Sequence, residues 1–469
     1  MSRHVPEAEE QVLSTLNLDG SRRWIRPKLS KGRFYRRRLV VAWTLIAAFT
    51  AIPYLEVGGK PLMLLDIPRQ QFTFFGKTFL ATDTMLLMLL LVGIFITIFL
   101  LTAIFGRVWC GWACPQTIYM EFIYRPIERL FEGSRARQLK MDREGASAGR
   151  VLKYVAYLGV SIFVAHTFLA YFVGVDQLFY WIQQPPAEHP TAFAIMALVT
   201  LLMFADFAYF REQVCIVACP YGRFQSVLLD RNSLIVGYDR RRGEVRGRLG
   251  EQKKGPPPEG GAWGDCVDCR ACVVTCPTGI DIRDGLQLEC IGCTQCIDAC
   301  DAVMEKLGRP RGLIRYSSQD ALKGRKTRIL RPRVVLYPLI LALVFGMLVL
   351  SLARKQDTDV TILRGLGAPY TQLPGGAISN QVRIKLVNRS NEDRLYTFSL
   401  VDGEGVEMIA PENPIRVGAG KTGTTALFLN VLPGSFAQGE RVVRIRIHSG
   451  EAFDREYEYR LLGPEGHGR

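Results

Sequence analysis

The stretch Cys266–Asp301 reads CVDCRACVVTCPTGIDIRDGLQLECIGCTQCIDACD. It contains eight cysteines in two runs, and each run has the spacing C-x2-C-x2-C-x3-C. The first run ends in Cys-Pro, whereas the second ends in Cys-Asp. Three closely spaced thiolates and a more distant fourth form the ligand pattern of a 4Fe–4S cluster, and paired runs exchange their fourth cysteine. We therefore expect two clusters in this part of the chain.

The spacing divides the eight cysteines between these two clusters. One cluster is expected to be held by Cys266, Cys269, Cys272 and Cys300. The other is expected to be held by Cys290, Cys293, Cys296 and Cys276. A pair of zinc sites is the alternative, because C-x2-C pairs also bind zinc. Two tripled runs without histidine favour iron–sulfur clusters.

Apolar runs on both sides of this module predict a polytopic α-helical membrane protein. About 17 to 25 apolar residues suffice to cross a bilayer. Five runs qualify: Leu39–Leu55, Thr84–Phe105, Tyr154–Phe172, Thr191–Phe210 and Val334–Leu352. The loop that begins at Gly106 is rich in Arg, whereas the loop at 175–190 contains neither Lys nor Arg. Short basic loops stay in the cytoplasm, so we expect the N terminus and the cysteine-rich module inside and the C terminus outside.

The last part of the chain has a different pattern. Short stretches there alternate polar and apolar residues and are separated by Asn, Gly and Pro. About seven strands at this spacing predict an antiparallel β-sandwich of immunoglobulin type, which we expect to be periplasmic and to serve in docking. The predicted parts are a cytoplasmic tail (1–38), four spans as two repeats that each end in C-x3-CP (39–222), a basic cytoplasmic linker (223–262), the two-cluster ferredoxin module (263–312), a fifth span (334–352) and the sandwich (356–465).

Two near-copies of a second cysteine motif follow apolar runs. They are RVWCGWACPQ at 107–116 and REQVCIVACPYG at 211–222, with the cysteines Cys110, Cys114, Cys215 and Cys219. Residues four apart on a helix share one face, about 5–6 Å apart, so each pair could bind one metal through two sulfurs. Because the two-helix unit repeats in parallel, both pairs are expected at the same membrane depth.

The surroundings of these pairs leave three interpretations open. Nearby arginines are expected to lower the pKa values of the thiols, and they are Arg107, Arg125, Arg211 and Arg223. Soft thiolates select Cu(I), zinc or iron–sulfur clusters, so the pairs either bind copper, hold a third cluster or are small buried residues. His166 and Asp206 lie within predicted spans and are candidates for a role. For His166 a hydrogen bond to the backbone of a neighbouring helix is the simpler expectation, and for Asp206 an ion pair with an arginine such as Arg211.

The motifs VWCGWACPQT, REQVCIVACPYGRFQ, the cysteine-rich module and GRPRGLIRYSS occur in this order. Together they resemble the FixG/CcoG family of cytochrome c oxidase accessory proteins, although the paired motifs are also shared with NapH/NosR-type polyferredoxins. The resemblance implies a ferredoxin-like cupric reductase of the bacterial inner (cytoplasmic) membrane. It would supply Cu(I) to a cbb(3)-type oxidase, with a copper transporter or chaperone and the oxidase assembly machinery as partners. It also implies that the paired membrane cysteines handle copper as the catalytic thiols.

On this basis, a cytosolic electron donor is expected to reduce the clusters, with Cu(II) as the acceptor. The alternatives are an electron relay from the cytosol to quinone or a periplasmic acceptor, and a copper-binding assembly factor without catalysis. The net charge of +15 is concentrated beside apolar runs, which indicates contact with membrane lipid. Basic residues are not interleaved with aromatic ones, so we expect no nucleic-acid partner.

Overall fold

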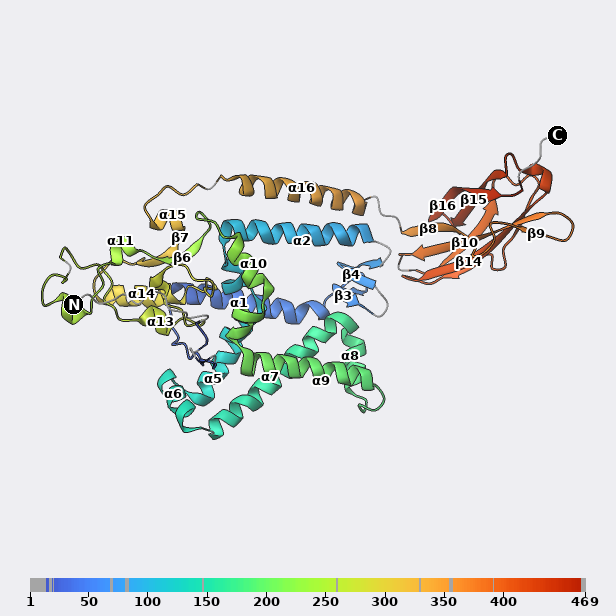
Figure 1. Cartoon of the computed structure of the whole chain (residues 1–469). Helices are drawn as coiled ribbons and strands as arrows, with labels where there is room; N and C mark the ends of the chain where they lie inside the picture. The colour runs from blue at the N-terminus through green and yellow to red at the C-terminus, as the bar shows by residue number, and fades with distance from the viewer. Residues whose placement is uncertain are drawn as a thin grey trace. The chain divides into compact units, whose positions relative to one another are not determined.

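The computed structural model of the chain (Figure 1) describes residues 14–16, 19, 21–67, 71–80, 84–145, 147–258, 260–328, 330–353, 357–390 and 392–464. The chain divides into two compact units. Unit 1 comprises residues 1–77 and 81–348, and unit 2 comprises residues 78–80 and 349–469. All twelve cysteines lie in unit 1.

Four helices in the described residues are long and apolar enough to cross a membrane. They are α2 (Thr84–Phe105), α7 (Ala148–Val173), α9 (Pro190–Ala205, continued by a π-helical turn, Asp206–Phe210) and α16 (Pro332–Ala353). The remaining predicted span, Leu39–Leu55, falls on the later part of α1 (Arg33–Ala51) and a short 3-10 turn. The first turns of α1 carry four arginines, so this helix is too highly charged to be one of the four candidate membrane spans. The predicted count of five spans is therefore approximate.

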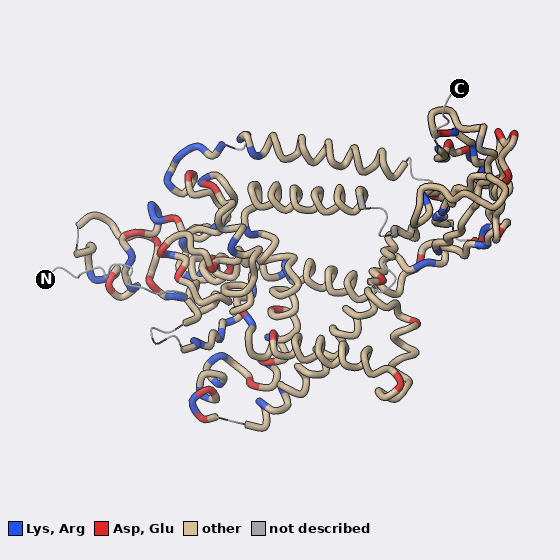
Figure 2. The backbone as a smooth tube through the Cα atoms, turned by 45° about the vertical axis from the view of Figure 1, so that its right-hand side comes forward, with Lys and Arg blue, Asp and Glu red and all other residues tan. Residues whose placement is uncertain are grey.

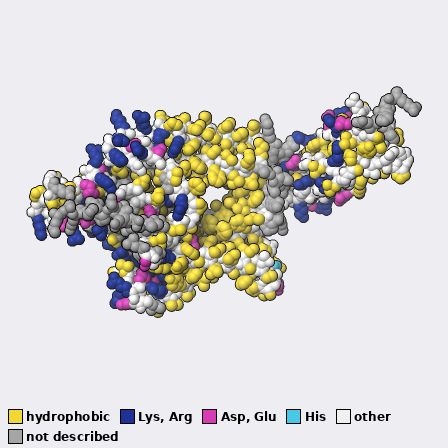
Figure 3. All heavy atoms as spheres, in the orientation of Figure 1, with side chains coloured by type: hydrophobic (Ala, Val, Ile, Leu, Met, Phe, Trp, Pro, Cys, Tyr) yellow, Lys and Arg dark blue, Asp and Glu magenta, His cyan; other side chains and the backbone are white. Residues whose placement is uncertain are grey.

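The apolar helices of unit 1 pack through aromatic contacts. On α2 and α16, which lie side by side, the rings of Phe99 and Tyr337 have centroids 6.4 Å apart. Near α7 and α9, Tyr124 stacks on Phe207 at 4.2 Å and meets Tyr157 edge-on at 4.8 Å. Apolar side chains cover the outer surface of these helices (Figure 3). Lys and Arg gather at one end of these helices (Figure 2).

Shorter elements connect the spans. After α1 come β1 (Glu56–Val57), β2 (Lys60–Pro61), β3 (Met63–Asp66), β4 (Gln71–Phe74) and β5 (Lys77–Leu80). Between α2 and α7 come α3 (Val108–Trp112), α4 (Pro115–Tyr119), a π-helical turn (Met120–Tyr124), α5 (Arg125–Glu132) and α6 (Arg135–Glu144). Helix α8 (Val175–Ile182) precedes α9, and a π-helical turn (Val214–Ala218) and α10 (Pro220–Leu228) follow it.

The ferredoxin module is wider than the sequence predicts. Strand β6 (Ile235–Tyr238) pairs antiparallel with β7 (Ile314–Ser317), so the predicted linker 223–262 contributes a strand to the module. Between these strands lie α11 (Arg240–Gly243), α12 (Leu249–Gln252), α13 (Ala271–Val274), a 3-10 turn (Ile282–Asp284) and α14 (Gln295–Lys306), and α15 (Gln319–Leu322) follows β7. Cysteine spacing locates the ligands but not the strands that flank them. The module predicted from the spacing, residues 263–312, is therefore shorter than the folded one.

Unit 2 is the predicted Ig-like β-sandwich. Its strands are β8 (Thr358–Arg364), β9 (Thr371–Gln372), β10 (Ile378–Asn388), β11 (Arg394–Leu400), β12 (Val406–Ile409), β13 (Ile415–Val417), β14 (Thr422–Val431), β15 (Glu440–Ser449) and β16 (Phe453–Leu462). One sheet has the order β12-β14-β10-β8, with β9 beside β10, and the other has the order β13-β11-β15-β16. Alternate residues of β10, including Val382 and Ile384, are fully buried between the sheets. This alternation is the period of two that the sequence showed.

Candidate electron-transfer site

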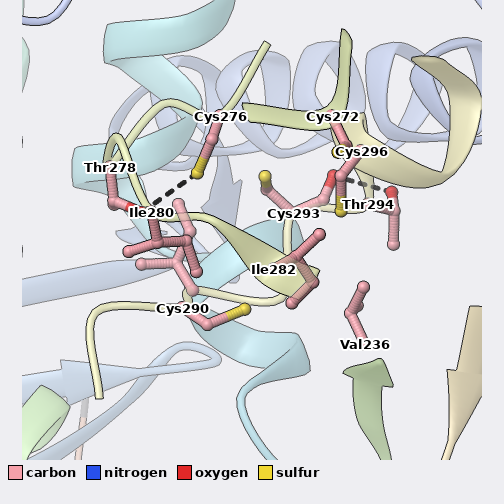
Figure 4. A pocket seen from close by; sticks show the side chains of 11 residues that line it. Val236, Cys272, Cys276, Thr278, Ile280, Ile282, Cys290, Cys293, Thr294 and Cys296 are labelled. Atoms are coloured by element: carbon pink, nitrogen blue, oxygen red, sulfur yellow. Dashed lines mark hydrogen bonds between the residues drawn. The ribbon is translucent and has the colours of Figure 1, made fainter. Parts of the chain in front are cut away.

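The eight ferredoxin cysteines line two cavities, each with about 340 Å³ of empty space. The first cavity is lined by Cys266, Cys269, Cys272 and Cys300. The second is lined by Cys276, Cys290, Cys293 and Cys296, and also by Cys272, which borders both. Figure 4 shows the sulfur atoms of the second set directed toward a common space. The fourth cysteine of each run thus lies with the other run, in the grouping that the spacing predicts.

Backbone turns bring the thiols of each run together. Arg270 and Thr294 adopt positive φ angles of 55° and 63° immediately before α13 and α14. This left-handed conformation turns the chain sharply. The cysteines of the helix that follows therefore lie beside those of the preceding loop. Ile280, Ile282 and Ile291 line the second cavity and make its wall largely apolar. Each of the four irons of a 4Fe–4S cluster binds one cysteine sulfur. An apolar cavity with four thiols around it therefore fits such a cluster.

Within the described residues, no group of three or more His, Cys, Asp or Glu converges as a single metal ion would require. Burial raises the pKa of Cys272 to about 12 and that of Cys290 to about 11. These free thiols are therefore protonated at neutral pH, although the thiolate is the form that binds metal. Metal binding at such thiols releases protons and contributes to folding.

The membrane cysteine pairs do not lie on continuous helices, so the predicted shared helix face is wrong. Cys110 lies in α3, but Cys114 is extended (φ −63°, ψ 125°) and precedes α4. Cys215 lies in a π-helical turn, and Cys219 is likewise extended (φ −71°, ψ 110°) before α10. Each helix breaks at the second cysteine because a residue before proline is disfavoured in the helical region.

We call the four membrane cysteines, Cys110, Cys114, Cys215 and Cys219, the thiol patch. In the described residues no three of them converge as a single metal ion would require. Burial is the largest cause that raises the pKa of Cys215, to about 12, and the charges of Cys114, Cys110 and Cys219 raise it further. Burial also raises the pKa of Cys110 to about 11, despite the opposing charge of Arg107. Arg107 thus lowers the pKa of Cys110 as predicted, but burial outweighs this effect and the net shift is upward.

The first membrane motif packs directly against the second cavity. Cys110, Ile291 and Cys293 form one buried apolar cluster, with Tyr221 packed against it. The Cys110 thiol also donates to Gln225 Oε1 (3.0 Å). A proposed metal-handling thiol and a proposed cluster ligand are therefore neighbours in the same buried core.

Hydrogen bonds also fix the position of the first membrane motif relative to the ferredoxin module. Arg38 Nε donates to the carbonyl oxygen of Gly111 at 2.9 Å. Trp112 Nε1 donates to the Tyr316 hydroxyl at 2.9 Å, and that hydroxyl donates to the carbonyl oxygen of Gly292 at 3.2 Å. A Cβ atom on Gly111 would lie 2.7 Å from the Ile291 carbonyl oxygen, which is too close. Only glycine permits this approach of the two backbones.

A buried network of charges lies beneath the second motif, and sequence analysis missed it. Arg211 donates through both terminal nitrogens to Glu128, at 3.0 and 3.1 Å, and Arg26 donates to the same carboxylate. Lys153 Nζ lies 2.7 Å from Glu132 Oε1. All five side chains are buried, with at most 4% of each exposed. In the sequence, these residues appear only as charged residues beside the predicted spans. Ordinary basic membrane flanks would give the same pattern.

The two polar residues within the predicted spans have simple partners. His166 Nδ1 lies 2.7 Å from the Ile162 carbonyl oxygen, one turn earlier on its own helix, and not from the backbone of a neighbouring helix as predicted. Asp206 accepts a hydrogen bond from Gln116 Nε2 at 2.8 Å, whereas Arg211 pairs with Glu128. The expected ion pair between Asp206 and Arg211 is therefore wrong. Gln116 directly follows the first Cys-Pro, so Asp206 connects the two repeats.

Replacing Gly111 by Val is expected to separate the first motif from the Ile291–Gly292 backbone, because the added Cβ clashes with it. Cys110, which is 8% exposed, should then react with a maleimide at least about ten-fold faster, since thiol reactivity follows exposure. Gly159→Val is the matched control, because a Cβ there meets nothing within 4 Å. Equal alkylation rates in the two variants would contradict this account of the contact.

Comparisons with known proteins agree with this arrangement. A family model described as a 4Fe-4S dicluster domain matches residues 210–319, and a second, described as a 4Fe-4S binding domain, matches residues 87–133. A third, described as the IG-like fold at the C-terminal of FixG, matches residues 348–464. These matches cover the ferredoxin module, the first membrane motif and the sandwich.

Three curated relatives extend over most of the chain. The nitrogen fixation protein FixG of Rhizobium meliloti is 32% identical and covers 86% of this chain and 82% of its own length. Protein RdxA of Cereibacter sphaeroides is 31% identical over 94% of both chains. Protein RdxB of the same organism is 32% identical and covers 91% of this chain and 93% of its own.

The apolar helices and the 4Fe–4S domains define the class, a membrane protein of iron–sulfur electron transfer. Within that class the chain belongs to the FixG family.

Proposed function

We propose that this protein transfers electrons from a cytosolic donor to Cu(II) at the inner membrane and supplies Cu(I) for assembly of a cbb(3)-type oxidase. The observation that carries the proposal is the buried cluster of Cys110, Ile291 and Cys293, which joins the ferredoxin module to the thiol patch. When bound, 4Fe–4S clusters supply one-electron transfer. In the overall reaction the donor loses one electron and Cu(II) gains it.

The residues of the chain have separate roles in this proposal. The first cavity is assigned to the cluster held by Cys266, Cys269, Cys272 and Cys300, and the second to the cluster held by Cys276, Cys290, Cys293 and Cys296. The thiol patch binds the product, because soft thiolates prefer Cu(I) to Cu(II). The thiols release their protons as the metal binds.

The orientation in the membrane follows the distribution of charge. Lys and Arg gather at the end of the unit 1 helices that carries the ferredoxin module (Figure 2). By the positive-inside rule this end is cytoplasmic, and α16 then leads to a periplasmic sandwich.

A second candidate is a third cluster held by the thiol patch. It is favoured by the 4Fe-4S binding model at 87–133, which includes Cys110 and Cys114. Iron content separates the two candidates, since two clusters contain about eight irons per chain and three contain about twelve.

The double variant Cys110→Ser/Cys215→Ser tests the proposal. The iron content and iron–sulfur absorbance are expected to stay unchanged, while dithionite-driven Cu(II) reduction falls at least about ten-fold, which corresponds to about 1.4 kcal/mol in the barrier. Ala113→Ser is the control, because it alters the same loop without removing a thiol.

Each other outcome of this experiment is informative. Undiminished Cu(II) reduction in the double variant rejects the role of the thiol patch, and a loss of about four irons supports the third cluster. Wild-type protein that binds copper stoichiometrically without turnover would be an assembly factor. Reduction of added quinone instead of copper would identify an electron relay.

A further inference from the structure

The two cavities of the ferredoxin module differ in their access to solvent. Of the eight ferredoxin cysteines, all of which the structure describes, Cys269 is the exposed one. It lines the first cavity. The second cavity packs against the first membrane motif through Cys293 and Ile291. A soluble donor can therefore approach the first cavity most closely at Cys269.

Arginines surround this exposed edge. Arg270 follows Cys269 and lines the first cavity. An Arg240 terminal nitrogen donates to the carbonyl oxygen of Arg283, which also lines the cavity, at 3.4 Å. Arg309 donates to the carbonyl oxygen of Asp265 at 2.6 Å, directly before the first cysteine of the run. We call Arg240, Arg270 and Arg309 the arginine rim.

The rim has an excess of positive charge. Of the carboxylates on this face, Asp265 pairs with Arg242, and Asp268 and Asp281 share Arg283. The exposed Asp284, next to Arg283, forms no ion pair in the described residues and offsets one of the rim charges. Within the described part of the chain, the three rim arginines form no ion pair with a carboxylate, and Arg240 and Arg270 are exposed. Figure 2 shows further Lys and Arg at the same end of unit 1.

We propose that the arginine rim docks an acidic one-electron carrier protein of the ferredoxin or flavodoxin type. Complementary charge steers such a partner to the edge where the first cavity is accessible. One electron passes per encounter, so the carrier is oxidised by one electron and the module is reduced by one, without bond formation or proton transfer. This inference rests on the proposed function, since it identifies the class of its donor.

The experiment uses the full-length protein in detergent micelles and a reduced, acidic 2Fe–2S ferredoxin as the probe. The second-order rate of module reduction is expected to fall at least about ten-fold between about 0.02 and 0.3 M salt. The double variant Arg240→Glu/Arg270→Glu should show a similar fall at low salt and a weaker affinity for the oxidised ferredoxin in calorimetry. Arg143→Glu on α6 is the control, because Arg143 is also exposed.

Dithionite separates a docking defect from a functional one. It should reduce wild type and the double variant equally, with unchanged iron content. Equal ferredoxin-driven rates in wild type and the double variant, or rates independent of salt, would overturn the docking proposal. Loss of binding to anionic lipid vesicles with unchanged ferredoxin kinetics would assign the rim to the membrane surface instead. Failure of the dithionite-reduced wild type to reduce Cu(II) would reject the proposed function and leave the docking result standing.

Discussion

Alanine at Cys276 is expected to reduce the iron content from about eight to about four atoms per chain. Cys276 belongs to the first run in sequence, but it lines the second cavity with Cys290, Cys293 and Cys296. Its loss should therefore empty the cavity that packs against Cys110 and leave the first cavity loaded. Without a redox centre beside the thiol patch, Cu(II) reduction should fall at least about 100-fold, about 2.7 kcal/mol in the barrier. Iron analysis and Cu(I) formation measure the two effects.

Cys300→Ala is the matched variant, because Cys300 belongs to the second run but lines the first cavity. It should also retain about four irons per chain. Its second cavity stays loaded, so dithionite should still drive Cu(II) reduction in Cys300→Ala but not in Cys276→Ala. Retention of all the iron in Cys276→Ala, or equal copper reduction in the two variants, would disprove the exchange of the fourth cysteines.

The features that sequence analysis predicted best depend on local spacing. The ligand grouping follows from two short runs, and the sandwich follows from a period of two that is visible in strands such as Ile378–Asn388. The helix break at Cys114 was also within reach, because Pro115 restricts the residue before it. From the sequence, the interruption of each helix is predicted at Pro115 and Pro220, whereas the structure places it one residue earlier, at Cys114 and Cys219.

The features that sequence analysis missed depend on tertiary contacts. The approach of Gly111 to Ile291 joins residues about 180 positions apart, and no local pattern encodes it. The pKa of Cys110 depends on how deeply the thiol is buried, which the adjacent Arg107 cannot reveal. The ion pair of Arg211 with Glu128 likewise could not be told from an ordinary basic membrane flank.

Replacing Glu128 by Gln is expected to destabilise the protein by about 3–5 kcal/mol, because it leaves two buried guanidinium groups without their shared carboxylate. Arg211 and Arg26 both donate to Glu128. Thermal denaturation in detergent should show the loss. The control is Glu144→Gln, because the pair of Glu144 with Lys140 is exposed and should contribute at most about 0.5 kcal/mol. Equal melting temperatures for the two variants would contradict a structural role for the buried network.

The same carboxylate predicts a pH dependence. Burial alone would raise the pKa of Glu128, but the charges of Arg211 and Arg26 outweigh it and lower the pKa from 4.5 to about 2. A lowered pKa means that the folded state binds the proton less readily than the unfolded state. The contribution of Glu128 is therefore complete above about pH 5 and is lost as the pH falls through 4.5 toward 2. Wild type should lose more stability than Glu128→Gln over this interval, and parallel losses would refute the assignment.

The network also anchors the second cysteine motif. Arg211 has a φ angle of 53°, a left-handed conformation that costs a non-glycine residue about 1–3 kcal/mol. Its paired hydrogen bonds to Glu128 offset that cost and fix the start of the segment that carries Cys215. In Glu128→Gln this segment should loosen, so that Cys215 reacts with a maleimide faster while Cys110, fixed by its contact with Ile291, does not. A parallel increase at both thiols would instead indicate general unfolding, which separates anchoring from a loss of global stability.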